Sequence, residues 1–70
     1  MNGFYRYDCP VIEGAAALYR RRDDEVRLFA IRKNGQWKLE SDEFLWEDKI
    51  AENSTLLSRE EAAVILFEAD

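Results

Sequence analysis

The sequence predicts a small α+β domain: a three-stranded antiparallel β-meander, with an N-terminal segment as a candidate edge strand, packed on one C-terminal α-helix. Two observations carry this prediction. Asn34-Gly35 separates two β-prone runs, and this dipeptide favours a type I′ hairpin turn because both residues tolerate positive φ. Near the C-terminus, Ser58 is followed three residues later by Glu61 and then by an apolar run, which is the pattern of a helix capping box. We treat residues 1–70 as one domain, because a chain of this length builds a single core.

The hairpin at Asn34-Gly35 fixes a register, and the register sorts side chains between two faces. A two-residue loop gives the pairs Lys33–Gln36, Arg32–Trp37, Ile31–Lys38, Ala30–Leu39 and Phe29–Glu40. Because side chains alternate along a strand, one face is apolar and is the expected core face, comprising Val26, Leu28, Ala30, Trp37 and Leu39, with Arg32 near the turn. The other face mixes two large apolar groups with charges, comprising Arg27, Phe29, Ile31, Lys33, Gln36, Lys38 and Glu40.

The first strand of the meander is expected over 15–21, before the acidic pair Asp23-Asp24. A loop of only these two residues would place Arg20 opposite Arg27, and like charges directly opposite each other destabilise a sheet. A loop of three residues, 22–24, instead places an arginine opposite a glutamate. The sequence therefore favours the three-residue loop.

Two other segments have weaker patterns. Residues 1–10 contain three β-prone aromatics before Pro10, so we expect an extended segment or edge strand whose rings could cover the mixed sheet face. Residues 41–57 show neither helical nor strand periodicity, and we interpret them as an irregular segment with at most one helical turn. A short helix from Ser41 and a short strand over 44–46 remain open alternatives.

The C-terminal helix is expected over 59–68, although its Val-Ile-Leu-Phe run is also β-prone. At helical spacing one apolar stripe contains Ala62, Ile65, Leu66 and Ala69. Val64 and Phe67 lie beyond this stripe, so the helix is apolar over most of its circumference. Such a helix is either buried on two sides or covered by a partner.

The net charge of −5 is unevenly distributed. Residues 1–38 contain eight Lys and Arg against five Asp and Glu, which gives +3, whereas residues 39–70 contain two against ten, which gives −8. A solvated surface with internal ion pairs accounts for this pattern. The sharper hypothesis is a dipolar molecule whose basic and acidic faces meet different partners.

Composition argues against most enzyme classes. The chain contains no histidine, and its single cysteine cannot form an internal disulfide. No glycine-rich phosphate loop or EF-hand pattern occurs, so we expect no enzyme activity, no metal and no cofactor. The longest apolar run is 62–67, far below the roughly 20 residues that span a bilayer. With no signal-peptide pattern either, we expect a cytoplasmic protein without a membrane segment.

These observations predict a non-catalytic protein-interaction module or small regulatory protein that self-associates as a homodimer. The candidate interaction surface combines the mixed sheet face with the second side of the helix, comprising Tyr19, Arg27, Phe29, Ile31, Lys38, Val64 and Phe67. The alternative is a small protein that binds single-stranded nucleic acid through arginines and aromatics on the sheet. The acidic C-terminal half disfavours this alternative, because its carboxylates repel phosphates.

Overall fold

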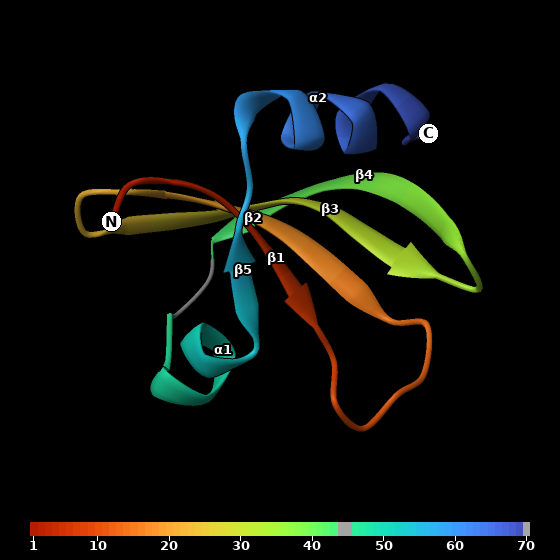
Figure 1. Cartoon of the computed structure of the whole chain (residues 1–70), viewed down its shortest axis with the longest axis horizontal. Coiled ribbons are helices and arrows are strands. Elements are labelled where there is room, and N and C mark those ends of the chain that lie inside the picture. Colours follow the sequence, from red (N-terminus) through yellow and green to blue (C-terminus); the bar gives the residue numbers. More distant parts are fainter. Residues whose placement is uncertain (44–45, 70) are drawn as a thin grey trace.

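A computed structural model of the chain describes residues 1–43 and 46–69. Within these residues the chain forms, in order, β1 (Gly3–Asp8), β2 (Ala16–Arg22), β3 (Glu25–Lys33), β4 (Gln36–Glu43), α1 (Asp48–Glu52), β5 (Ser54–Leu56) and α2 (Arg59–Glu68). The strands make one antiparallel sheet in the spatial order β4-β3-β2-β1-β5. The sheet is strongly twisted, with α2 across one face and α1 below β5 on the other side (Figure 1). The predicted α+β class with a C-terminal helix is confirmed, with two strands more than the predicted three.

The β3–β4 hairpin forms as predicted. Asn34 and Gly35 have φ of 54° and 76°, the positive values that a type I′ turn requires at both positions. The four pairs nearest the turn, from Lys33–Gln36 to Ala30–Leu39, have the predicted register. The predicted Phe29–Glu40 pair does not form, because the register shifts at this point and places Leu28 opposite Asp42.

This shift is part of a β-bulge centred on Phe29. On one side of β3, Leu18 faces Ala30 while Tyr19 faces Leu28, so β3 has one residue more than β2 over this step. On the other side, β4 has one residue more than β3. An extra residue moves the side chains beyond it to the opposite face and bends the strand. The bulge therefore bends β3 and places its apolar residues before and after Phe29 on different faces of the sheet.

Each face of the sheet carries its own apolar cluster. The helix-side cluster contains Ala16, Leu18, Ala30, Trp37 and Ile65, with Phe4, Phe29, Leu57, Leu66 and Ala69 packed against it. The opposite cluster contains Ala17, Tyr19 and Val26, with Tyr7, Leu28 and Trp46 packed against it. The predicted core face was therefore wrong beyond the bulge, since Val26 and Leu28 lie opposite to Ala30, and Phe29 joins Ala30. Leu39, also predicted in the core, is 55% exposed.

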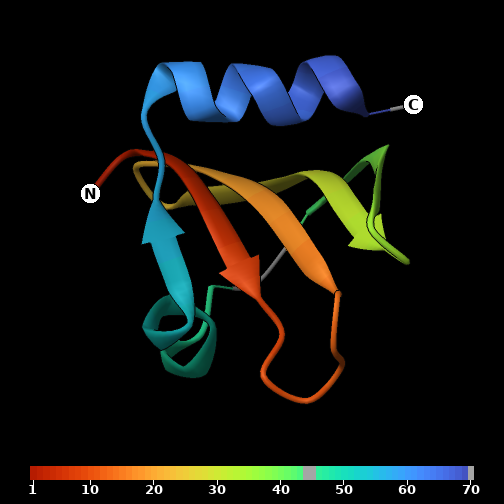
Figure 2. The ribbon, with the colours of Figure 1, turned by 45° about the vertical axis from the view of Figure 1, so that its right-hand side comes forward.

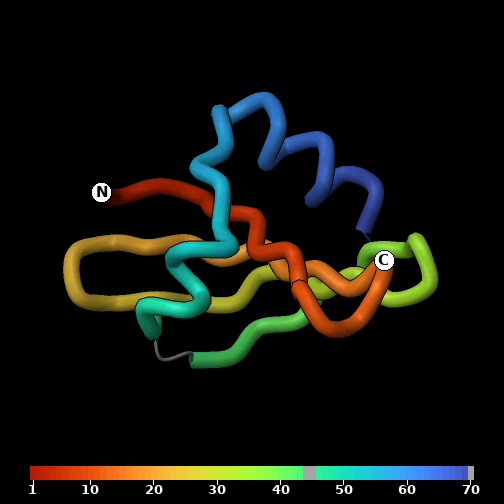
Figure 3. Tube along the Cα trace, turned by 60° about the horizontal axis from the view of Figure 1, so that its bottom comes forward, coloured from red at the N-terminus to blue at the C-terminus, as the bar shows by residue number. Residues whose placement is uncertain are grey.

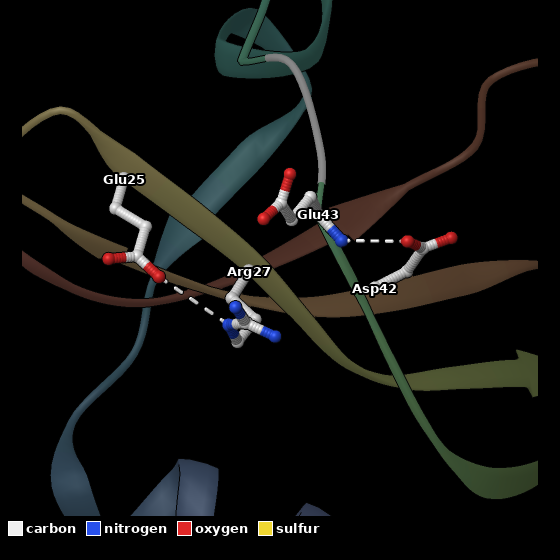
Figure 4. A network of polar contacts seen from close by, with 4 residues as sticks. All are labelled: Glu25, Arg27, Asp42 and Glu43. Atoms are coloured by element: carbon white, nitrogen blue, oxygen red, sulfur yellow. Dashed lines mark hydrogen bonds and ion pairs between the residues drawn. The ribbon is translucent and has the colours of Figure 1, made fainter.

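The β2–β3 loop contains two residues, so the predicted three-residue loop was wrong, and Arg20 does lie opposite Arg27. Each arginine has its own partner, which relieves the repulsion. The guanidinium carbon of Arg20 lies 4.9 Å from the ring centroid of Phe29. Arg27 Nε lies 3.5 Å from Glu25 Oε1, on the side away from Glu43 (Figure 4). The bulge supplies the first partner, because it turns Phe29 toward the face of Arg20.

The segment 41–57, predicted as irregular, contains the end of β4, the short helix α1 and the three-residue strand β5. The alternative strand over 44–46 falls partly on residues 44–45, outside the described residues. β5 pairs with the outer side of β1, so β1 is an inner strand and not the expected edge strand. A strand of three residues is too short to show a periodicity, which explains why the pattern gave no signal.

Helix α2 begins and ends at the predicted residues. Its capping box is complete, because Glu61 N donates to Ser58 Oγ at 3.1 Å and Ser58 N donates to Glu61 Oε1 at 3.0 Å. The predicted buried stripe is also confirmed, with Ala62 2% and Ile65 8% exposed. The helix lies across the sheet above β1 and β4 (Figure 2) and runs from β5 toward the β3–β4 turn.

Candidate functional site

A pocket of about 490 Å³ opens where β1, β2, β5 and the start of α2 meet. Its apolar lining comes from Gly3, Phe4, Leu56 and Leu57, and its polar lining from Asn2, Arg20, Arg21, Arg22 and Arg59. Four of these nine residues are arginines and none is acidic, although the chain as a whole has a net charge of −5. We call this hollow the arginine pocket. Its size is within the range typical of small-ligand sites, roughly 300–1,000 Å³.

Strand pairing assembles the arginine pocket from distant parts of the chain. Phe4 lies opposite Arg20 in the β1–β2 register. On its other side, Leu57 N donates to Phe4 O at 2.9 Å, which draws the β5–α2 connection against β1. Glycine suits position 3, because its φ of +144° is rarely adopted by other residues and a Cβ there would lie 3.1 Å from Leu56 Cδ1. The N-terminus is tied to the same end of the sheet (Figure 3), where Asp23 N donates to Asn2 Oδ1 at 2.8 Å.

The arginines of the pocket have few acidic partners. Among the described residues the ion pairs are Arg6–Asp8, at 3.0 Å, and Arg27–Glu25, at 3.5 Å. Neither pair involves an arginine of the pocket. A neighbouring hollow of about 580 Å³ shares Arg20 and Arg22 with the pocket, and its lining adds the carboxylates of Asp23, Asp24, Glu25 and Glu43. These carboxylates lower the positive potential at the outer rim of the arginine pocket. Within the described part of the chain they form no ion pair with either arginine.

Arg20 is the innermost of these arginines. Its guanidinium stacks on Phe29, and its Nε is buried with no hydrogen-bond partner among the described residues. A buried donor without an acceptor costs about 1–3 kcal/mol. Arg21 differs from Arg20 in the face that it contacts: its guanidinium carbon lies 5.9 Å from the centroid of the Trp46 ring, which belongs to the opposite cluster. The pocket therefore offers the exposed Arg22 and Arg59 as donors for an anion, whereas Arg20 lines it from a half-buried position.

The second feature is the solvent-facing side of α2. Val64 is 56% and Phe67 is 92% exposed, as expected for residues outside the buried stripe. Phe67 lies three residues after Val64 and four residues after the exposed Ala63, so the three side chains are neighbours on one side of the helix. We call this apolar set, Ala63, Val64 and Phe67, the outer stripe. The charged residues of the helix, all exposed, are Arg59, Glu60, Glu61 and Glu68. The outer stripe is thus flanked mainly by carboxylates.

The structure does not unite the predicted sheet residues with the helix residues in one patch. Tyr19 is only 5% exposed and belongs to the opposite cluster, with its ring 6.1 Å from that of Trp46. Phe29 is half-buried beneath Phe4, whose ring lies edge-on with a centroid separation of 5.3 Å. The expected cover of the mixed face by an N-terminal aromatic is therefore present at Phe29. The bulge that rearranges these residues has no local sequence signal.

The other predicted surface residues lie at separate places on the sheet. Arg27 is partly buried and is paired with Glu25. Ile31 is half-buried and Lys38 is exposed, and these two residues lie opposite each other near the β3–β4 turn. Of the predicted set, only Val64 and Phe67 are large apolar side chains with more than half of their surface exposed.

Cys9, the single cysteine of the chain, is a nucleophilic side chain with an altered environment. Hydrogen bonds from the backbone amides of Val11 and Ile12 lower the pKa of its thiol, and a hydrogen bond with Tyr7 adds to this effect. These contacts favour the thiolate. The chain contains no histidine to act as the imidazole partner of an activated cysteine. We therefore assign Cys9 no part in the candidate site.

Within residues 1–43 and 46–69, no helix is long and apolar enough to cross a membrane. No group of three or more metal-ligating side chains gathers in the same residues. Comparisons with protein-family models, with curated proteins and with solved structures found no match to this chain.

Proposed function

We propose that this protein is a non-catalytic interaction module or small regulatory protein that associates with further copies of itself. The observation that supports this proposal best is the outer stripe of α2. Phe67 is 92% exposed on a helix that is already capped at Ser58 and anchored through Ile65. The helix does not need the outer stripe in order to fold. The apolar side chains of the stripe therefore contribute favourable burial energy only when another molecule covers them.

The energy available from the outer stripe sets the expected strength of association. Full burial of a phenylalanine or valine side chain contributes about 1.5–3 kcal/mol. Association costs an estimated 4–15 kcal/mol in lost translational and rotational freedom. Two such residues per copy therefore support a weak, concentration-dependent assembly rather than a permanent subunit interface.

Single-stranded nucleic acid is less well supported as a partner. Binding without sequence preference needs exposed aromatic rings on which bases stack, alongside the cations. Tyr19 is buried, and Phe29 is covered by Phe4 and Arg20. Neither of these two rings is therefore free to stack on a base beside the arginines, as the nucleic-acid hypothesis requires.

The test is the mass of the protein in solution, measured by size exclusion with light scattering from micromolar to millimolar concentration. We expect the mass of the wild-type protein to rise with concentration and that of Phe67→Ser to stay at one chain. Val11→Ser is the matched control, because Val11 is also widely exposed, at 87%, but lies in the β1–β2 loop. A wild-type protein that remains monomeric throughout, or a Phe67→Ser variant that associates like the wild type, contradicts the proposal.

A further inference from the structure

We infer that the self-association is head-to-tail: the end of the outer stripe, with Phe67 and Glu68, docks into the arginine pocket of a second copy. This inference rests on the proposed self-association and names the surface that α2 meets. It joins two features that the fold keeps apart, an exposed phenyl ring beside a carboxylate and an apolar pocket surrounded by guanidinium groups.

The charges of α2 disfavour a symmetric contact between two outer stripes. Its exposed charged residues are three glutamates and one arginine. A two-fold interface presents the same patch on both copies, so it would bring two acidic surfaces together. Like charges facing each other across an interface are strongly unfavourable. The surface that covers the stripe is therefore expected to be basic.

The arginine pocket of a second copy meets this requirement. Its apolar residues include Phe4, Leu56 and Leu57, and its volume of about 490 Å³ admits a phenyl ring. The guanidinium fork of arginine matches the geometry of a carboxylate, which it binds through two parallel hydrogen bonds. Arg22 and Arg59 are exposed and have no ion pair within the described residues. They are therefore available to Glu68 when Phe67 enters the pocket.

The position of the two features makes the contact intermolecular. The pocket includes Arg59, the first residue of α2, whereas Phe67 lies in the last turn. At 1.5 Å per residue these positions are about 12 Å apart along the helix axis. In Figure 2 the helix is straight and extends away from β5, so its end cannot fold back to its own start. When the stripe of each copy enters the pocket of the next copy rather than both contacts forming across one two-fold axis, the contact is heterologous and generates an open chain or a ring of copies.

The test uses two variants that each remove one half of the contact. Phe67→Ser removes the inserted ring, and the double variant Arg22→Glu, Arg59→Glu reverses the charge of the pocket while leaving Arg20 on Phe29. We expect each variant alone to be monomeric by sedimentation velocity. An equimolar mixture should form a complex of two chains and nothing larger, because only one intact contact can form. The wild-type mass should pass beyond that of a dimer and should fall with added salt.

Lys33→Glu, Lys49→Glu is the matched control, since it makes the same change in net charge at two exposed residues, one at the end of β3 and one in α1. We expect it to associate like the wild type. Circular dichroism verifies that each variant is folded, and Arg22→Gln, Arg59→Gln replaces the reversed pair if that pair unfolds.

The outcomes separate this inference from the proposed function. If the pocket variant still associates while Phe67→Ser does not, the stripe meets another surface, so self-association stands and the head-to-tail contact is refuted. A mixture that remains monomeric also refutes the head-to-tail contact. A wild-type protein that is monomeric at every concentration overturns the proposed function itself.

Discussion

The two faces of α2 are built from the same kinds of residue but have opposite environments. On the inner face, Ala62 and Ile65 are almost fully buried, at 2% and 8% exposure. On the outer face, Val64 and Phe67 are 56% and 92% exposed. The difference does not come from hydrophobicity, since phenylalanine is the largest apolar side chain of the four. It comes from the sheet, which the helix can contact with only one face, and it separates residues needed for folding from residues available for binding.

The largest expected effect tests the inner face. Ile65→Ala should lower the free energy of unfolding by about 2–5 kcal/mol, because it leaves a cavity among Leu18, Ala30 and Trp37. Val64→Ala, a substitution one residue earlier on the outer face, should change the free energy of unfolding by no more than about 0.5 kcal/mol. Urea unfolding followed by tryptophan fluorescence measures both. If the two variants lost the same free energy of unfolding, the outer face of α2 would have to be buried against other residues of the same chain.

A smaller effect is expected at the N-terminus of α2, which supports both faces at once. Ser58→Ala removes the acceptor for Glu61 N and should cost about 0.5–2 kcal/mol of stability. Because the first turn then frays, self-association should also weaken. Ser58→Asn is the control, since asparagine caps helices as well as serine does. A Ser58→Ala variant with unchanged urea unfolding would mean that the capping box contributes nothing to this helix.

Two turns of equal length show which parts of the fold the sequence could predict. Asn34-Gly35 was predicted correctly because the preference for positive φ resides in the two residues themselves. At Asp23-Asp24 the prediction was wrong, although it applied a sound rule about facing arginines. Relief of that repulsion depends on Phe29 lying beneath Arg20, and no pattern near the turn reveals the bulge that places it there.

The candidate site likewise contains one feature that local sequence predicts and one that only the tertiary structure reveals. The exposure of Val64 and Phe67 follows from helical spacing, a local property, and was predicted. The arginine pocket was not predicted as a whole, because its residues come from four elements and the connections between them. The run Arg20–Arg22 drew attention to positive charge in the sequence. The apolar residues Leu56 and Leu57 lie beside these arginines only because β5 pairs with β1, and β5 is too short to be recognised in the sequence.

The smallest expected effect is a pH dependence at the cap. A hydrogen bond from the Ser58 backbone amide, assisted by the Ser58 side chain, lowers the pKa of the Glu61 carboxyl below its ordinary value of 4.5. Folding is therefore favoured when Glu61 is charged. This contribution is complete above the pKa of the unfolded chain and is lost as the pH falls through the lower pKa of the folded state. Glu61→Gln removes the titration but keeps an oxygen that can accept from Ser58 N.

The urea midpoint of Glu61→Gln should thus fall less steeply than that of the wild type as the pH is lowered from about 7 to about 3. Glu60→Gln is the matched control, because Glu60 precedes Glu61 in the same turn but does not take part in the capping box. If all three proteins lose stability in parallel, the Glu61 carboxylate adds no charge-dependent stabilisation. In that case the start of α2 would be held at every pH by the hydrogen bonds from Glu61 N to Ser58 Oγ and from Ala62 N to Ser58 O, and both faces of the helix would depend on these uncharged contacts.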